Sequence, residues 1–355
     1  MKKKAYFLFF FYISFCFSAY AKKELYTIWQ DTVVVNDPLI EKIIDSKAMQ
    51  RLKLIDQFGP APYIGLLPYF SRYDHSIGVF VLLQKAQVSK IEQIAGLLHD
   101  TSHTVFSHLG DNLFYHEQQE KSYQDTIHLW FLRSMKIDEI ISRYNITIKD
   151  LDPDDPKYTA LERPLPDLCS DRIQYNIHTA VILNKISKLE AKEIVDDLKF
   201  HNGVWFFTNK NTAKKFAMIP LYLIKELWGA PFNAVVYDYF HKILKRAIKI
   251  KLVSKDELHF SVDQNVMQKI ENSNDKIIKN LLNKCKEDAK SFRLAKYGNG
   301  QINIKPKFRG IDPLILDNNQ YKKLSQLDED FSKKFKEVQN WCKNGYGINL
   351  PNSED

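Results

Sequence analysis

Apolar residues recur at helical spacing along most of the chain. The first such stretch runs from Ile40 to Ile55, with apolar side chains every three to four residues, and Gly59-Pro60-Ala61-Pro62 then breaks the pattern. The same period returns several times further along. The predicted helices cover residues 40–55, 72–83, 91–100, 117–135, 171–195 and 214–250.

The sequence predicts only small amounts of strand. Residues 22–37 form a short extended lead rich in β-branched residues. Leu198 to Asn209 is typical of a hairpin, because His201-Asn202-Gly203 supplies a tight turn between two apolar runs. After residue 250, short strands mix with Lys-rich helices, and residues 341–355 have the composition of a polar tail. The pattern therefore predicts a mainly α fold with small β-hairpin additions.

The composition indicates an ordered chain with a sizeable core. Its 355 residues are 45% hydrophobic, which suits one large domain or two smaller ones. The formal net charge of +8 fits anionic ligands or a membrane surface, although a solvated basic face is the commoner explanation. No run of Arg and Lys interleaved with aromatic residues indicates nucleic acid. The cysteines form no CxxC pair, which argues against a zinc knuckle or a disulfide scaffold.

The first 21 residues have the pattern of a secretory signal peptide. Lys2, Lys3 and Lys4 precede an apolar run from Ala5 to Phe17, and Ala19-Tyr20-Ala21 fits a cleavage site. The run is short for a bilayer span, which needs ~20 residues. We therefore expect an exported protein, periplasmic or secreted, with a mature net charge of +5 and no stable membrane span.

The densest group of ionisable residues lies between His99 and Asp111. His99 and Asp100 place a nitrogen and an oxygen ligand side by side, which suits a divalent cation. An apolar run ends directly before them, and a buried Asp100 is costly unless it is paired or bound to metal. On a continuing helix His103 would share a face with His99. A His-Asp dipeptide is common, so its surroundings must decide what it means.

Another histidine lies at the start of a predicted helix. Ser71 is a good N-cap, and Asp74 follows three residues later, close to a capping box. His75 is therefore expected in the first turn of that helix.

Together with their flanks, these residues resemble the HD superfamily, and within it the deoxynucleoside triphosphate triphosphohydrolases. SRYDHSIGV at 71–79 is similar to that group's TRFEHSLGV, and LLHDTSHTVFSH at 97–108 to its LLHDIGHGPFSH. Residues 50–57, His116-Glu117 and residues 171–175 resemble further motifs in the same order. The resemblance covers about residues 40–180, with a fainter similarity at 305–313.

The resemblance implies an HD-domain helical core that holds one divalent ion. Its ligands would be His75, His99, Asp100 and Asp171. The ion would activate water and polarise a phosphoryl oxygen. Ligands of this kind suit Mn, Fe, Zn, Mg, Ni or Co, and do not distinguish among them.

The resemblance also implies roles for residues around the metal. The catalytic positions are His103, His116 and Asp111, with Asp111 orienting one of the two histidines. The substrate-binding positions are Gln57, Arg72, Arg172 and Tyr175. Arg72 would clamp phosphate, Arg172 and Tyr175 would face the phosphates, and Gln57 would approach the sugar. His108, by contrast, is expected to be a buried structural histidine.

Two segments depart from the family pattern. The loop after Asp100 lacks the family's glycines and proline, so Ser102 and Thr104 would be strained if positive φ angles are needed there. In the last motif, His178 and Thr179 stand where the family has an Arg-Asp pair whose Asp contacts the sugar. The loss of that carboxylate weakens the expectation of a deoxynucleotide substrate.

The sequence therefore predicts a divalent-metal-dependent phosphohydrolase that acts on a nucleotide, such as a deoxynucleoside triphosphate, or on a related phosphate ester. The alternative is an HD-fold protein that binds a nucleotide or a partner without catalysis. The expected division is a signal peptide at 1–21, an HD domain at 22–210, a C-terminal α+β extension at 211–340 and a polar tail at 341–355. Because the family is often multimeric, a homo-oligomer is a further implication.

Overall fold

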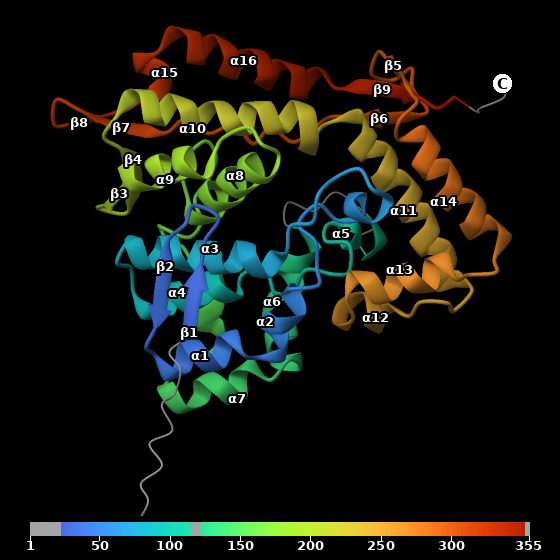
Figure 1. The fold of residues 1–355 in the computed structure, drawn as a ribbon, viewed down its shortest axis with the longest axis horizontal. Helices are drawn as coiled ribbons and strands as arrows, with labels where there is room; N and C mark the ends of the chain where they lie inside the picture. Colours follow the sequence, from blue (N-terminus) through green and yellow to red (C-terminus); the bar gives the residue numbers. More distant parts are fainter. Residues whose placement is uncertain (1–22, 115–121, 352–355) are drawn as a thin grey trace, which may run out of the picture.

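The computed structural model of the protein describes residues 23–114 and 122–351. The predicted signal peptide and His116 lie outside the described residues. Helices dominate the described chain and short strands form three small sheets, which confirms the mainly α fold (Figure 1). Within the described residues, no helix is both long and apolar enough to cross a bilayer.

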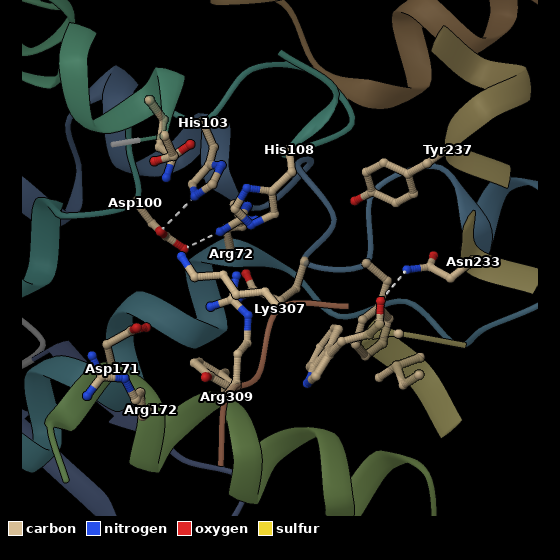
Figure 2. Close-up of a pocket in the computed structure, with 18 of the residues that line it drawn as sticks. Arg72, Asp100, His103, His108, Asp171, Arg172, Asn233, Tyr237, Lys307 and Arg309 are labelled. Atoms are coloured by element: carbon tan, nitrogen blue, oxygen red, sulfur yellow. Dashed lines mark hydrogen bonds and ion pairs between the residues drawn. The ribbon is translucent and has the colours of Figure 1, made fainter. Parts of the chain in front are cut away.

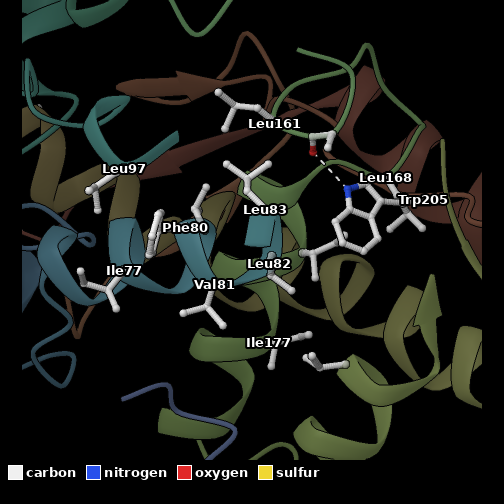
Figure 3. Packing of buried hydrophobic residues seen from close by; sticks show 14 of the residues in the cluster. Ile77, Phe80, Val81, Leu82, Leu83, Leu97, Leu161, Leu168, Ile177 and Trp205 are labelled. Atoms are coloured by element: carbon white, nitrogen blue, oxygen red, sulfur yellow. Dashed lines mark hydrogen bonds between the residues drawn. The ribbon is translucent and has the colours of Figure 1, made fainter. Parts of the chain in front are cut away.

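Three helices form the centre of the molecule. They are α3 (Arg72–Lys85), α4 (Lys90–Leu98) and α8 (Ser170–Ile182). Ser71 and Ser89 cap α3 and α4 by accepting hydrogen bonds from backbone N–H groups of the first turn. Figure 3 shows the core that the three helices share. The labelled side chains include Phe80, Leu82 and Leu83 of α3, Leu97 of α4 and Ile177 of α8.

Further helices surround this centre, and Figure 1 places α1 and α7 at one end of the molecule and α10 and α16 at the other. Their bounds are α1 (Pro38–Ile44), α2 (Lys47–Leu52), α5 (Leu109–Phe114), α6 (Tyr123–Ser134), α7 (Ile137–Ile141), α9 (Lys188–Asp197), α10 (Lys210–Leu223), α15 (Leu324–Leu327) and α16 (Glu329–Asn344). Short 3₁₀ turns cover Ala61–Ile64, Ser142–Tyr144 and Ile148–Leu151, and a π-helical turn covers Ile224–Trp228.

A second apolar cluster lies beside the first. It is built around α11 (Pro231–Lys249), α12 (Lys255–Phe260), α13 (Asp263–Glu271) and α14 (Lys276–Asp288). Phe106, from the loop after α4, belongs to this cluster and packs edge-on against Phe240 of α11. The loop that follows the His-Asp pair is therefore held by the C-terminal helices.

The strands form three separate sheets. A hairpin joins β1 (Lys23–Tyr26) and β2 (Thr32–Val35). A four-stranded sheet has the order β3-β4-β7-β8, and a three-stranded antiparallel sheet has the order β5-β9-β6. Their bounds are β3 (Leu198–His201), β4 (Val204–Phe207), β5 (Arg293–Ala295), β6 (Ile302–Ile304), β7 (Leu314–Asp317), β8 (Gln320–Lys323) and β9 (Tyr346–Asn349). The predicted hairpin at 198–209 is confirmed as β3 and β4.

The apolar period located the helices but joined several that the structure separates. Ser46 caps α2 and so divides the predicted helix at 40–55. Ser187 and Glu190 form a capping box that starts α9 and divides the helix predicted at 171–195. Pro231 starts α11 within the stretch predicted at 214–250. In each case a cap residue interrupts the helix while the apolar spacing continues.

The end of the chain differs from the predicted polar tail. Tyr346 and Ile348 are buried in β9, the central strand of its sheet, and Cys342 is buried in α16. The prediction of a polar tail is therefore wrong for residues 341–350. The apolar residues alternate there at the strand period, and the intervening polar residues hid them. The boundary at residue 210 stays a prediction.

Candidate metal centre

The four predicted metal ligands converge where the three central helices meet. His75 and Asp171 lie in the first turns of α3 and α8. His99 is the C-cap of α4, and Asp100 follows it. Because each residue lies in or next to the terminal turn of a packed helix, the backbone limits the direction of each side chain.

The ligand atoms lie within a few ångströms of one another. His75 Nε2 is 3.1 Å from His99 Nε2 and 3.0 Å from Asp171 Oδ1. Asp100 Oδ2 is 3.6 Å from His75 Nε2, and Asp100 Oδ1 is 3.5 Å from His99 Nε2. The imidazole nitrogens of His75 and His99 and a carboxylate oxygen of Asp171 lie close enough together to hold a divalent ion. Asp100 lies beside this group, and its two oxygens also contact Arg72 and His103.

The electrostatics of the cluster favour positive charge at its centre. Burial alone would lower the pKa of His99, but Asp100 and Asp171 raise it to about 9. Burial would raise the pKa of Asp171, but hydrogen bonds from His75 and His99 hold it well below its ordinary value. Both carboxylates are therefore ionised at neutral pH, and a bound cation would satisfy them.

Hydrogen bonds on the far side of each imidazole set which nitrogen faces the centre. His99 Nδ1–H donates to the Gly96 carbonyl at 2.7 Å. His75 Nδ1–H donates to Gln174 Oε1. Each Nε2 therefore faces the metal position, where a bound ion would take the place of a proton, and these partners act as the outer contacts that orient metal-bound histidines.

Gln174 is itself held by its neighbours. Its Nε2 donates to His178 Nδ1 at 3.1 Å, and the His178 ring stacks on Phe70 with 3.8 Å between the ring centroids. Gly78 of α3 leaves the space that Gln174 needs, because a Cβ there would lie 2.5 Å from Gln174 Nε2. His178, at the position of the family's arginine, thus orients the residue that orients His75.

Arg72 contacts the centre directly. Its Nη1 donates to Asp100 Oδ2 at 2.6 Å and its Nε to Ser107 Oγ at 2.8 Å, and the side chain is 1% exposed. The expected role of Arg72 in binding phosphate stays a prediction. Its Nη2 is buried without a hydrogen-bond partner among the described residues.

The loop after α4 does not continue the helix, so the expectation that His99 and His103 share a helix face is wrong. Positive φ angles occur at Phe106 and Ser107, both at 58°, and not at Ser102 or Thr104. The Asp263 carboxylate accepts a hydrogen bond from the Phe106 N–H at 2.7 Å. The positive φ angles expected near the missing glycines therefore occur further along the loop. Buried contacts such as this hydrogen bond stabilise the backbone there.

His103 faces the metal position from the loop. Its Nε2 lies 3.1 Å from Asp100 Oδ1. Burial and the charge of Arg72 lower the pKa of His103 to about 3, against the opposing effect of Asp100. The imidazole is therefore neutral at pH 7 and bonded to a metal ligand.

Asp111 pairs with His108 and not with His103. Asp111 Oδ2 is 3.3 Å from His108 Nδ1, and Asp111 Oδ1 accepts a hydrogen bond from the Tyr123 N–H at 2.7 Å. The side chain of His108 is 39% exposed and lines the pocket, so the expectation of a buried structural histidine is wrong. His108 can present its Nε2 to a substrate while Asp111 holds its Nδ1.

A pocket of about 580 Å³ opens over the metal ligands, a size that suits a nucleotide-sized molecule. Gln57, Arg172 and Tyr175 line it, as expected of substrate contacts, and their roles stay predictions. Arg172 already bonds to the Asp167 carbonyl and pairs with Glu162. Figure 2 shows the metal-side residues on one side of this pocket and Asn233 and Tyr237 on the other.

Sequence reasoning missed several residues of the pocket. They are Glu162, Asn233, Tyr237, Lys307 and Arg309. Burial and the neighbouring Asp171 raise the pKa of Glu162 to about 8, against the effect of Arg172. None of the five belongs to a metal-ligand pattern. Only the faint family similarity at 305–313 pointed to Lys307 and Arg309.

Comparison with known proteins gives several similar chains, although no family model matches this sequence. The uncharacterised protein YdhJ of Bacillus subtilis is 31% identical over 88% of this chain and 95% of its own length. The metal-dependent phosphohydrolase cns2 of Cordyceps militaris is 27% identical over 61% of this chain and 64% of its own. The deoxynucleoside triphosphate triphosphohydrolase SAMHD1 of Bos taurus is 35% identical over 27% of this chain, and the match spans 21% of that protein.

A solved structure has the same fold. A phosphohydrolase from Bacteroides thetaiotaomicron superimposes with a TM-score of 0.68 over 92% of this chain and 99% of its own, at 16% sequence identity. The likeness covers the central helices and the C-terminal region alike.

Proposed function

Because the chain belongs to the HD superfamily of metal-dependent phosphohydrolases, we propose that it hydrolyses a phosphate ester or anhydride of a nucleotide or a similar molecule. The observation that carries the proposal is the convergence of His75, His99 and Asp171, with Asp100 beside them, next to a pocket that His99, Asp100 and Asp171 line. A divalent ion held there would activate water and stabilise charge on a phosphoryl oxygen.

The protein's own residues would prepare this centre. Gln174 and the Gly96 carbonyl fix the Nε2 lone pairs of His75 and His99. Arg72 keeps Asp100 ionised and limits its freedom to turn. Such preorganisation lowers the cost of assembling the site during the reaction.

For proton transfer, we infer that His108 is better placed than His103. His103 Nε2 is engaged by Asp100, and its Nδ1 is buried without a partner among the described residues. His108 is half-exposed in the pocket, and Asp111 can hold its Nδ1–H, which leaves Nε2 to exchange a proton with a leaving oxygen. An orienting carboxylate behind an imidazole is the usual arrangement for this task.

The proposed substrate class is broader than deoxynucleoside triphosphates. Thr179 is fully buried, and His178 is packed on Phe70, so neither supplies a carboxylate to a sugar in the pocket. The match to SAMHD1, a protein named for deoxynucleotide hydrolysis, spans 21% of its length. The size of the pocket and the similarity to SAMHD1 support a nucleotide substrate. They do not support selection of deoxyribose over ribose.

The test is a hydrolysis screen of the chain from Lys22 onward with Mn, Fe, Zn, Mg, Ni or Co. The panel holds ribo- and deoxynucleotides and simple phosphate esters, with the products identified. We expect at least about 10³-fold loss of turnover in Asp100→Ala, since a proposed metal ligand is removed. We expect wild-type turnover in His201→Ala, a change at the exposed end of β3. Metal binding without turnover of any substrate would contradict the proposal and indicate the binding role.

We also propose that the protein is exported, on the strength of Lys2 to Lys4, the apolar run and Ala19-Tyr20-Ala21. Fractionation of bacteria that express the full chain with a C-terminal tag, followed by N-terminal sequencing, tests it. We expect a mature chain outside the cytoplasm that starts at Lys22. A cytoplasmic chain that retains Met1 would contradict export.

A further inference from the structure

A segment from the C-terminal part of the chain closes one side of the pocket. Residues 305–313, here called the strap, connect β6 to β7 without regular secondary structure. Pro306, Gly310 and Ile311 in the strap are buried. Lys307 and Arg309 lie on either side of Phe308, between these buried positions, and line the pocket.

The strap is fixed at several points. Asp312 N–H donates to the Pro166 carbonyl at 3.0 Å, and the Asp312 side chain accepts two hydrogen bonds from Ser325. Phe308 packs edge-on against Phe335 of α16. These contacts fix the backbone on both sides of Arg309, so the Cα of Arg309 has a defined position beside the pocket.

Lys307 and Arg309 have no ion-pair partner among the residues that the structure describes. Figure 2 draws both side chains between Asp171 and Arg172 on one side and Tyr237 and Asn233 on the other. The charge of Arg309, together with partial burial, lowers the pKa of Lys307. Two neighbouring cations at the edge of a pocket attract an anion that can bind between or beside them.

The pocket also offers donors without partners. Arg72 Nη2 and the Tyr175 hydroxyl are both buried and lack a hydrogen-bond partner within the described chain. Both residues line the pocket with the two strap cations. Buried donors of this kind are satisfied when a ligand supplies acceptor oxygens.

We propose that Lys307 and Arg309 bind the phosphates of an organic di- or triphosphate, whose chain lies between the metal centre and the end of the pocket at Asn233 and Tyr237. The proposal rests on the proposed function and adds a selection for polyphosphates over monoesters. A monoester carries about two negative charges, which the metal centre and Arg72 can satisfy alone. Each further phosphate would meet one of the strap cations.

The far end of the pocket fits the organic part of such a molecule. Trp228, Ala234 and Tyr237 give it an apolar and aromatic lining, and Asn233 adds a polar side chain. The order along the pocket is therefore metal ligands, strap cations and aromatic lining, which matches a phosphate chain attached to an aromatic or sugar-bearing group.

The first test measures binding and does not depend on catalysis. Inorganic triphosphate and orthophosphate are titrated calorimetrically into the full chain after gel filtration has removed unbound metal. Lys307→Gln and Arg309→Gln are each expected to weaken triphosphate binding about tenfold or more, and orthophosphate binding less than about threefold. Lys305→Gln is the matched control, since Lys305 lies on the same strap but covers the ring of Tyr297 outside the pocket.

The second test is kinetic and compares a nucleoside triphosphate with p-nitrophenyl phosphate. We expect the two strap variants to raise KM for the triphosphate about tenfold and to leave kcat/KM for the monoester unchanged. Equal triphosphate affinity in wild type and both variants would overturn the strap proposal, as would equal losses for orthophosphate. An inactive wild type that still binds triphosphate through these residues would instead overturn only the proposed hydrolysis.

Discussion

At the metal centre, each histidine's neighbour decides which nitrogen it offers. Gln174 stands behind His75, and His178 and Phe70 stand behind Gln174. The sequence motif identified His75 as a ligand, but the amide that orients it lies about 100 residues away in α8. His178, which replaces the family's arginine, thus has a structural role behind Gln174 that the sequence motif did not indicate.

We predict that Gln174→Leu weakens the binding of Mn²⁺ about 10- to 100-fold, because His75 loses the acceptor that fixes its tautomer. Isothermal titration of the full chain measures the affinity directly. Gln174→Glu should restore binding, since its carboxylate accepts the same hydrogen bond. The control is Gln93→Leu, which removes from α4 an amide that donates a hydrogen bond to the Val88 carbonyl. Unchanged affinity in Gln174→Leu would rule out the orienting role.

At the scale of elements, the short strand β9 joins the end of the chain to the second apolar cluster. Its Ile348 is fully buried, and it pairs with Leu294 of β5 on one side and Ile302 of β6 on the other. The strand also neighbours the start of the strap, because β6 runs directly into residue 305. The chain terminus therefore helps to position residues of the pocket.

We predict that Ile348→Ala lowers the free energy of unfolding by about 2–5 kcal/mol, the cost of a cavity in a packed core. Leu294→Ala, its cross-strand neighbour with a side chain 63% exposed, should change it by less than ~0.5 kcal/mol. Urea denaturation followed by circular dichroism compares the two variants. Equal effects would mean that β9 is not packed as the structure describes.

At the scale of the whole molecule, two buried carboxylates connect the central helices to the C-terminal helices. Asp56 accepts hydrogen bonds from the N–H groups of Phe58 and Phe70. Asp263, at the start of α13, accepts them from Asp56 and Phe106. Burial raises the pKa of Asp56 to about 8 and that of Asp263 to about 7, even though these hydrogen bonds favour the ionised forms.

We therefore predict that the free energy of unfolding falls as the pH rises from about 6.5 to about 8. In this range the folded protein retains protons on Asp56 and Asp263 that the unfolded chain has lost, so their contribution disappears as the pH passes the folded pKa values. Below about pH 6.5 the histidines His103 and His128 have the opposite effect on the free energy of unfolding, because both stay neutral in the folded protein and take up protons on unfolding. The lower limit of the pH window is therefore about 6.5.

Urea unfolding at several pH values within that window tests the prediction, with Asp263→Asn as the comparison. The variant keeps an amide oxygen as an acceptor but cannot ionise, so its stability should depend less steeply on pH. Identical slopes in the two proteins would show that Asp263 does not titrate in this range.

The types of candidate ligand, the order of the motifs and the helices that carry them could be predicted from the amino-acid sequence, because these depend on local spacing and on residues close in the chain. The 198–209 hairpin belongs to this group, and so do His75, His99 and Asp171, which the fold brings together. The role of Asp100 as a fourth ligand stays a prediction. Other contacts became visible only in the folded chain: Arg72 binds Asp100, Asp111 pairs with His108, and the strap brings Lys307 and Arg309 to the pocket. Such pairings join residues through packing of distant elements, and no periodicity along one segment records which distant side chain will lie opposite.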